Sequence, residues 1–200
     1  MLKLYFAPRT RAVRIRWLLE ELGIPHELER VEFRPQSTPF AQATPSGKIP
    51  VLVDGDVVIG ESGAILEYVL EAHGNGRLAP AIGSRQRGEF LQWVHFAEGT
   101  AFPPLGVLIW HGIYRGDADR IPEAIDAARE RAHSALAVLE RHLSTREHLL
   151  GAEFSAADIM VGFTVAAAQF LGLLDSRYPF TATYLDHLVR RPAFQRATLD

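Results

Sequence analysis

The stretch SGKIPVLVDGDVVIGES, residues 46–62, contains two short β-type runs, IPVLV and VVI, joined by an Asp-Gly-Asp turn. The Asp54-Gly55 step supplies the positive φ that a tight hairpin turn needs. A helix is expected over residues 62–73, because apolar side chains recur there at helical spacing. These are Ile65, Leu66, Val69 and Leu70. The stretch therefore predicts a ββα unit.

The residues before this stretch predict a βαβ unit. Leu2–Phe6 is typical of a strand, and Ala12–Leu22 has the apolar spacing of a helix that Gly23 ends. His26–Phe33 alternates weakly as a second strand, and residues 34–45 form a polar, proline-rich connection. The order βαβ-loop-ββα describes a small α/β layer with a right-handed crossover.

The second half of the chain shows only helical patterns. They run over residues 85–114, 121–143, 155–173, 181–189 and 192–197. Pro103 and Pro104 are expected to kink or break the first of them, because proline donates no helix hydrogen bond. We therefore expect an α/β domain over residues 1–75, a glycine-rich linker over 76–84 and an all-helical domain over 85–200.

Composition limits the function classes. The formal net charge of −3 gives no general electrostatic reason to expect a nucleic-acid partner. No apolar run approaches the roughly 20 residues that span a bilayer, so no membrane association and a cytoplasmic location are expected. The chain has no cysteine, which removes disulfides and cysteine ligands, and its eight histidines are scattered. No metal site is expected.

One motif in the second half is structural. Ser155 and Asp158 have the spacing of a capping box, in which each side chain bonds the backbone N–H of the other residue. Phe154 and Ile159 stand at the positions of a hydrophobic staple. We expect these residues to hold the fold and to take no part in chemistry.

The start of the helix at residue 62 is a candidate binding site. The exposed N–H groups of a helix N-terminus bind carboxylates, and Ser62 adds a hydroxyl donor. Glu61 could pair with an ammonium group, so the pair would suit the two charged ends of an amino acid; alternatively, Ser62 is only a cap and Glu61 a solvated charge. If the Ile49–Pro50 bond is cis, the backbone of Ile49 is free to pair with an extended ligand.

These segments together resemble a known family. LKLYFAPRTRAVRIRWLLEELGIPHELERV (residues 2–31) and PSGKIPVLVDGDVVIGESGAILEYV (residues 45–69) resemble the thioredoxin-like domain of a bacterial-type cytosolic glutathione transferase. FSAADIMVG (residues 154–162) is similar to the capping motif of its helical domain, and RPAFQRA (residues 191–197) extends the resemblance along the chain. The resemblance implies a homodimeric enzyme with glutathione as its co-substrate. Such an enzyme joins the glutathione thiolate to a small hydrophobic electrophile.

The resemblance also implies roles for the residues of the opening stretch. The bond before Pro50 would be cis, and the backbone of Ile49 would pair with the cysteinyl part of glutathione. Glu61 and Ser62 would hold the γ-glutamyl end, and Lys48 would lie toward the glycine carboxylate. An extended zwitterionic peptide needs such backbone pairing in its middle and opposite charges at its tips.

The resemblance leaves three candidates for the group that activates the thiol. One alignment places Tyr5 on the family's catalytic tyrosine and Arg9 near the thiol, whereas the alignment to serine-type members leaves Thr10 as the nearest hydroxyl. Tyr5 could instead be core packing, Thr10 a helix cap, and Arg9 and Arg11 solvated charges. We favour Thr10 with Arg9 assisting, followed by Tyr5.

The electrophile is expected between the two domains, against the first long helix of the helical domain. Phe102, Trp110 and Tyr114 could line an apolar pocket there, with Leu105 and Leu108 nearby, although core or dimer contacts would explain them equally. Two alternatives to a transferase remain on the same fold. These are a non-catalytic glutathione-binding or ligand-binding protein and a glutathione-dependent isomerase or dehalogenase.

Overall fold

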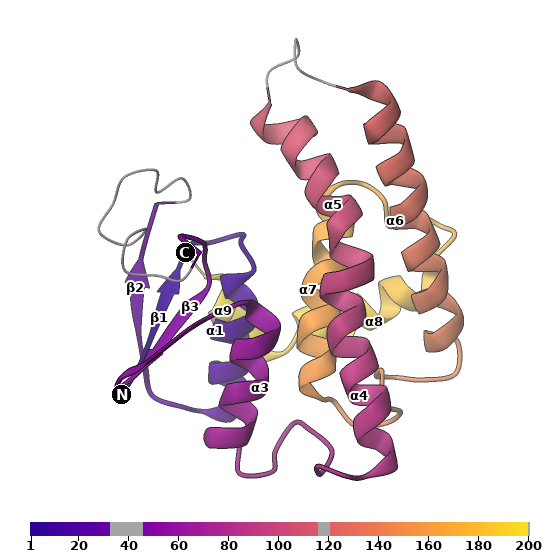
Figure 1. Ribbon diagram of the computed structural model, residues 1–200. Coiled ribbons are helices and arrows are strands. Elements are labelled where there is room, and N and C mark those ends of the chain that lie inside the picture. The colour runs from indigo at the N-terminus through magenta and orange to yellow at the C-terminus, as the bar shows by residue number, and fades with distance from the viewer. Residues whose placement is uncertain (33–45, 116–120, 200) are drawn as a thin grey trace. The chain divides into compact units, whose positions relative to one another are not determined.

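The computed structural model describes residues 1–32, 46–115 and 121–199, and the chain divides into two compact units (Figure 1). The first unit contains residues 1–81 together with 189–200, and the second contains residues 82–188. The sequence places the last helix in the helical domain, whereas the structure packs it on the first unit. The reason is a set of contacts with the first helix, described below.

The first unit is a thioredoxin-like βαβ-ββα layer, as predicted. Its elements are β1 (Leu2–Phe6), α1 (Ala12–Leu22), β2 (His26–Arg30), β3 (Val51–Asp54), β4 (Val57–Gly60), α3 (Ser62–Ala72) and α9 (Pro192–Thr198). The strand order is β2-β1-β3-β4, with β1 and β2 parallel and the other neighbours antiparallel. The mixed sheet follows from the crossover through α1 and the tight β3–β4 turn.

The second strand is shorter than predicted. The sequence pattern extends it to Phe33, but its pairing with β1 runs only from Leu2↔His26 to Phe6↔Arg30. Because β1 ends at Phe6, β2 has no partner strand beyond Arg30. The end of the predicted strand and the connection over residues 34–45 lie outside the described residues.

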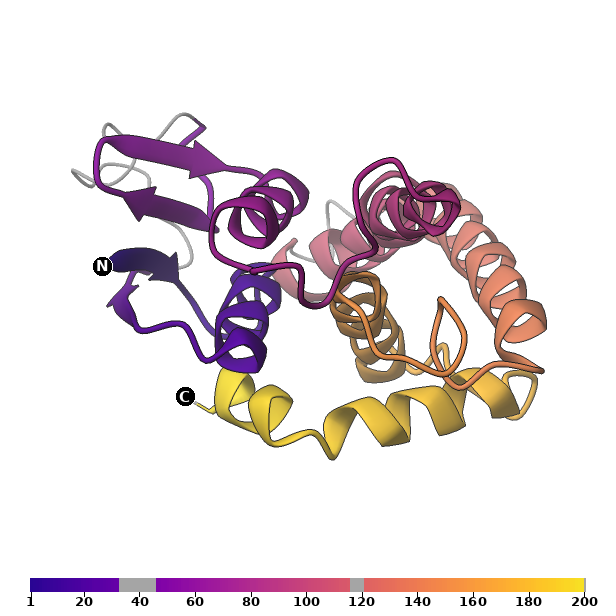
Figure 2. The ribbon, with the colours of Figure 1, turned by 90° about the horizontal axis from the view of Figure 1, so that it is seen from below.

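One face of the sheet carries the core of this unit. Leu2, Leu4 and Phe6 are buried, and α1 and α3 lie on the same side of the sheet (Figures 1 and 2). The guanidinium of Arg16 on α1 lies 5.1 Å from the ring of Phe6, which places that face toward α1. Since strand residues alternate in direction, Tyr5 points to the opposite face.

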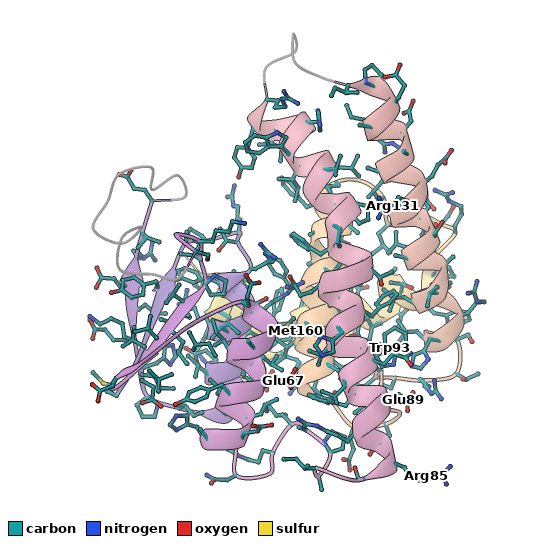
Figure 3. All side chains as sticks on the ribbon, viewed as in Figure 1. Glu67, Arg85, Glu89, Trp93, Arg131 and Met160 are labelled. Atoms are coloured by element: carbon teal, nitrogen blue, oxygen red, sulfur yellow. The ribbon has the colours of Figure 1, made fainter. Side chains whose placement is uncertain are left out.

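The regular elements among the described residues of the second unit are helices, apart from an isolated bridge between His148 and Gly151. Its elements are α4 (Arg85–Phe96), η1 (Ala97–Ala101), α5 (Phe102–Ile109), η2 (Trp110–Tyr114), α6 (Pro122–Leu143), α7 (Ala156–Phe170) and α8 (Pro179–Val189), the last ending at the boundary with the first unit. Trp93 on α4 and Met160 on α7 are both buried (Figure 3).

The predicted break at Pro103-Pro104 takes the form of a π-helical turn. The segment η1 directly precedes α5, and the N–H of Phe102 bonds the carbonyl of Ala97, five residues earlier. Neither proline has an N–H, so the carbonyls of the preceding turn lose their usual donors. The wider π turn accommodates the two rings without ending the helical path.

The predicted capping box is present at the start of α7. The buried Asp158 carboxylate accepts hydrogen bonds from the N–H and the hydroxyl of Ser155, at 2.8 and 3.0 Å. It also accepts the N–H of Leu149 at 2.9 Å and the hydroxyl of Tyr184 at 3.1 Å. This single carboxylate therefore joins the start of α7 to the preceding loop and to α8.

Candidate functional site

The N-terminus of α3 is a strained helix start directly after β4. Glu61 has φ of 64° and Ser62 is the first helical residue. A side chain at positive φ is unfavourable by about 1–2 kcal/mol, and such conformations gather at functional sites. Glu61 is exposed, whereas Ser62 is only 3% exposed. The first turn of α3 thus presents an exposed carboxylate beside a buried hydroxyl.

The buried hydroxyl is connected to α1 by an arginine that the sequence patterns did not single out. Nη1 of Arg14 donates to Oγ of Ser62 at 3.1 Å, and Arg14 has no exposed surface. Burial, followed by the charge of Arg11, lowers the pKa of Arg14 well below its usual value. Helical spacing was the sequence signal that could have indicated this burial. Arg14 stands four and eight residues before Leu18 and Leu22, which are buried on the same face of α1.

The loop before β3 holds the predicted peptide-binding residues. The Ile49–Pro50 peptide bond is cis, the conformation that the resemblance implied. Neither polar backbone group of Ile49 has a hydrogen-bond partner among the described residues, while β3 pairing begins at Val51. Lys48 is exposed. The backbone of Ile49 is therefore available to an extended ligand.

The candidate thiol activators occupy different environments. The hydroxyl of Thr10 donates to the carbonyl of Ala7 at 2.7 Å and accepts the N–H of Ala12 at 3.3 Å, so Thr10 organises the start of α1. Arg9 is exposed, with φ of 60°. Tyr5 lies within β1 and is half-buried, on the face away from α1. Arg9 and Thr10 are thus neighbours at the helix start, and Tyr5 is apart from them on the strand.

The three aromatic candidates all belong to the helical unit. Phe102 packs against the core cluster of this unit and stacks on Phe163, with ring centroids 6.0 Å apart. Trp110 and Tyr114 lie together on η2, with centroids 6.3 Å apart, and Trp110 is 54% exposed. Trp110 and Tyr114 are thus close together at the end of the α5 segment, whereas Phe102 belongs to the packing of the unit's core.

The described ranges contain neither a cluster of metal ligands nor a membrane-spanning helix. In residues 1–32, 46–115 and 121–199, no three His, Asp or Glu side chains gather in a way that could hold a metal ion. No helix in these ranges has the length and apolarity that a membrane crossing requires.

Comparison with known proteins gives the family. The glutathione S-transferase N-terminal domain model matches residues 1–71, and the C-terminal domain model matches residues 122–187. The disulfide-bond oxidoreductase YfcG of Escherichia coli (strain K12) is 31% identical over 212 residues, covering 100% of this chain and 95% of the relative. The chain belongs to the glutathione S-transferase family. Glutathione S-transferase 3 of Zea mays is 30% identical, covering 98% of this chain and 92% of the relative.

Solved structures of glutathione transferases share the fold. URE2P6 from Phanerochaete chrysosporium, in complex with oxidized glutathione, has a TM-score of 0.87 at 27% identity, covering 98% of this chain and 94% of that one. A glutathione transferase family member from Pseudomonas fluorescens pf-5, with two glutathione molecules bound, has a TM-score of 0.84 at 30% identity, covering 98% and 92%. Glutathione is therefore the ligand of structural relatives from both a fungus and a bacterium.

Proposed function

We propose that this protein is a glutathione transferase that binds glutathione along the Ile49 loop and the start of α3, and joins its thiolate to a small hydrophobic electrophile. The observation that carries the proposal is the state of Ser62. Its hydroxyl accepts a hydrogen bond from a buried arginine and donates none to any described residue, at a helix N-terminus that favours anions. This donor is suited to a carboxylate.

The charged and polar groups match the parts of glutathione in order. The α-carboxylate of the γ-glutamyl end is assigned to Ser62 and the N–H groups of α3, and its ammonium group to Glu61. The cysteinyl backbone is assigned to the unpaired N–H and C=O of Ile49, and the glycine carboxylate to Lys48. The loop thus provides backbone pairing for the middle of the peptide and opposite charges for its ends.

The chemical step requires the thiolate form of glutathione. The thiol proton leaves to solvent, the sulfur forms a bond to the electrophilic carbon, and the leaving group departs or the strained ring opens. Arg9 would stabilise the thiolate by its charge. Thr10 remains a candidate donor, but its hydrogen must first leave the carbonyl of Ala7, to which it is donated at 2.7 Å. Tyr5 is the third candidate.

The electrophile and the assembly complete the proposal. We assign Phe102, Trp110 and Tyr114 to contact with the electrophile. On η2 the exposed Trp110 lies beside the half-buried Tyr114, and Phe102 is half-buried at the start of α5. Glutathione acts as a co-substrate, and no metal is required by this chemistry. We also propose a homodimer, the assembly that the family resemblance implies.

Retention on immobilised glutathione tests the binding part of this proposal. Ser62→Ala is expected to weaken retention markedly, whereas the exposed Ser84→Ala should bind like the wild type. Titration of the bound thiol then tests catalysis, because a transferase should lower the thiol pKa by one or more units from about 8.5. Retention with an unshifted thiol pKa would identify a non-catalytic binding protein. A panel of aryl halides, epoxides, hydroperoxides and isothiocyanates would identify the electrophile.

A second candidate is glutathione-dependent disulfide exchange. It is favoured by the similarity to a disulfide-bond oxidoreductase and to structures that contain oxidized glutathione or two glutathione molecules. Because this chain has no cysteine, every sulfur atom that takes part in the exchange would belong to glutathione or to the substrate disulfide. A glutathione thiolate would attack a substrate disulfide and release one thiolate, and a second glutathione would resolve the mixed disulfide to oxidized glutathione. Formation of oxidized glutathione from a small disulfide, accelerated by the protein, would support this activity.

A further inference from the structure

The contact between Arg14 and Ser62 fixes the direction of a hydroxyl hydrogen. A guanidinium group has only donors, so in this 3.1 Å bond Oγ of Ser62 must be the acceptor. The hydroxyl hydrogen therefore points away from Arg14. No described residue accepts it, although Ser62 is only 3% exposed.

A buried hydroxyl whose hydrogen has no acceptor is unfavourable, because a buried donor without a partner has lost its hydrogen bond to water. The contact of Ser62 with α1 does not supply this acceptor, because Arg14 can only donate. The first turn of α3 supplies only further donors on this side. All the groups gathered at this point, namely the guanidinium, the hydroxyl and the helix N–H groups, can donate to one anion or support a group that does.

We propose that Arg14 is a positioning residue, which holds Ser62 as a one-way donor to the α-carboxylate of the γ-glutamyl end of glutathione. The inference rests on the proposed function, and it adds a residue that neither the motif nor the family resemblance assigned. Arg14 has no exposed surface, so it acts through Ser62 and does not touch the ligand.

The location of Arg14 makes this role selective for a carboxylate. A guanidinium in a low-dielectric interior interacts more strongly with a nearby anion than an exposed one does. It also prevents Ser62 from turning its hydrogen inward and offering a lone pair to the ligand. The pair should therefore discriminate against a ligand that keeps the thiol and the peptide backbone but lacks the α-carboxylate.

The test compares two ligands by calorimetry: glutathione and γ-aminobutyryl-cysteinyl-glycine, which keeps the amino group of glutathione and lacks only the α-carboxylate. The variants are Arg14→Gln, Arg14→Lys and Ser62→Ala. Arg16→Gln is the matched control, because it removes another arginine of α1, whose Nη1 donates to the carbonyl of Leu199. Thermal unfolding of each variant is recorded in parallel.

Arg14→Gln is expected to weaken glutathione binding roughly ten- to a hundredfold while changing binding of the analogue less than about threefold. Arg14→Lys retains a charge and a donor, so it should lose only part of this discrimination. If Arg14→Gln does not fold, the lysine variant carries the same comparison. In a Ser62→Ala background, Arg14→Gln should cause little further loss for glutathione.

Three results would overturn the inference. These are an equal loss for both ligands, an undiminished loss in the Ser62→Ala background, or an equal effect from Arg16→Gln. Failure of the proposed function looks different, because the wild-type protein would then bind neither ligand. Wild-type protein that binds both equally well would bind glutathione without using its α-carboxylate. This result would refute the roles of Ser62 and Arg14 at the carboxylate and leave glutathione binding itself in place.

Discussion

Arg191 and Glu21 form a bidentate ion pair across 170 residues of sequence, with hydrogen bonds of 2.6 and 2.8 Å. Glu21 also accepts the indole N–H of Trp17 at 2.9 Å, and the ring of Trp17 meets that of Phe194 edge to face at 4.8 Å. The last turn of α1 contains acidic side chains and no basic one, an unfavourable arrangement at a helix C-terminus. The α9 segment offsets that charge and completes the first unit.

Removal of this ion pair should destabilise the protein. Arg191→Ala leaves the carboxylate of Glu21, 10% exposed, without its main partner, so we expect a loss of about 1–3 kcal/mol in the free energy of unfolding. The neighbouring Arg190→Ala is the control, because that side chain is exposed, and it should change stability by less than about 0.5 kcal/mol. Urea denaturation measures both. Equal values would mean that α9 is held by its apolar contacts alone.

The β3–β4 turn depends on glycine for its backbone conformation. Gly55 has φ of 57°, and a Cβ there would meet nothing within 4 Å. Gly55→Ala should therefore cost about 1 kcal/mol through backbone strain alone. Gly88 is equally open but lies within α4 at negative φ, so Gly88→Ala should stabilise by about 0.5–1 kcal/mol. Shifts of the same sign in thermal unfolding would contradict this explanation.

The Asp158 carboxylate should matter more than the serine that it caps. Ser155→Ala removes a capping hydroxyl and should cost about 0.5–2 kcal/mol. Asp158→Ala leaves the buried N–H of Leu149 and the hydroxyl of Tyr184 without their acceptor, so about 3 kcal/mol or more is expected. Tyr184→Phe, which removes one donor, should cost about 1 kcal/mol. Equilibrium unfolding of the three variants measures these losses of stability and gives their order.

Stability should fall in mild acid through His133. Burial, followed by the charge of Arg177, lowers the pKa of His133 below its ordinary 6.5, and Nη2 of Arg177 lies 3.1 Å from its Nε2. The unfolded chain therefore binds more protons between the folded pKa and about 6.5. The contribution of neutral His133 to the free energy of unfolding is therefore complete above about pH 6.5, and it is lost as the pH falls through that window.

Thermal unfolding between about pH 8 and pH 5 measures this effect. His133→Gln should make the midpoint less dependent on pH across the window, whereas the exposed His187→Gln should leave the profile of the wild type. An unchanged profile for His133→Gln would assign the acid sensitivity to other groups.

The thiol activator can be identified by substitution. Arg9→Gln is expected to raise the pKa of bound glutathione, because an exposed cation at the start of α1 favours the thiolate. Thr10→Val should raise it only if the hydroxyl exchanges its bond with Ala7 for one with the sulfur. Tyr5→Phe supplies the third comparison. The ultraviolet absorbance of the thiolate, followed against pH, gives all three values, and unchanged values throughout would place the activator elsewhere.

The local elements were predictable because their signals are local. Helical spacing and Gly23 give α1 with its observed bounds, and the Asp54-Gly55 step gives the hairpin. The capping box at Ser155 follows from two residues three positions apart. The end of β2 was overestimated, because strand length is set by the partner strand and not by the residues of the strand itself.

The sequence alone determined the α/β-then-helical order and the family resemblance, and it led to the prediction that residues 46–62 bind a peptide. Tertiary structure decided which distant residues complete them: Arg14 behind Ser62, and Arg191 against Glu21. The physical reason is that spacing and capping act over a few residues, whereas burial of a charge is tolerated only where the fold supplies a partner. A pattern along the chain can show that Arg14 lies on a buried stripe, but only the packing of α1 beside α3 makes it a donor to Ser62.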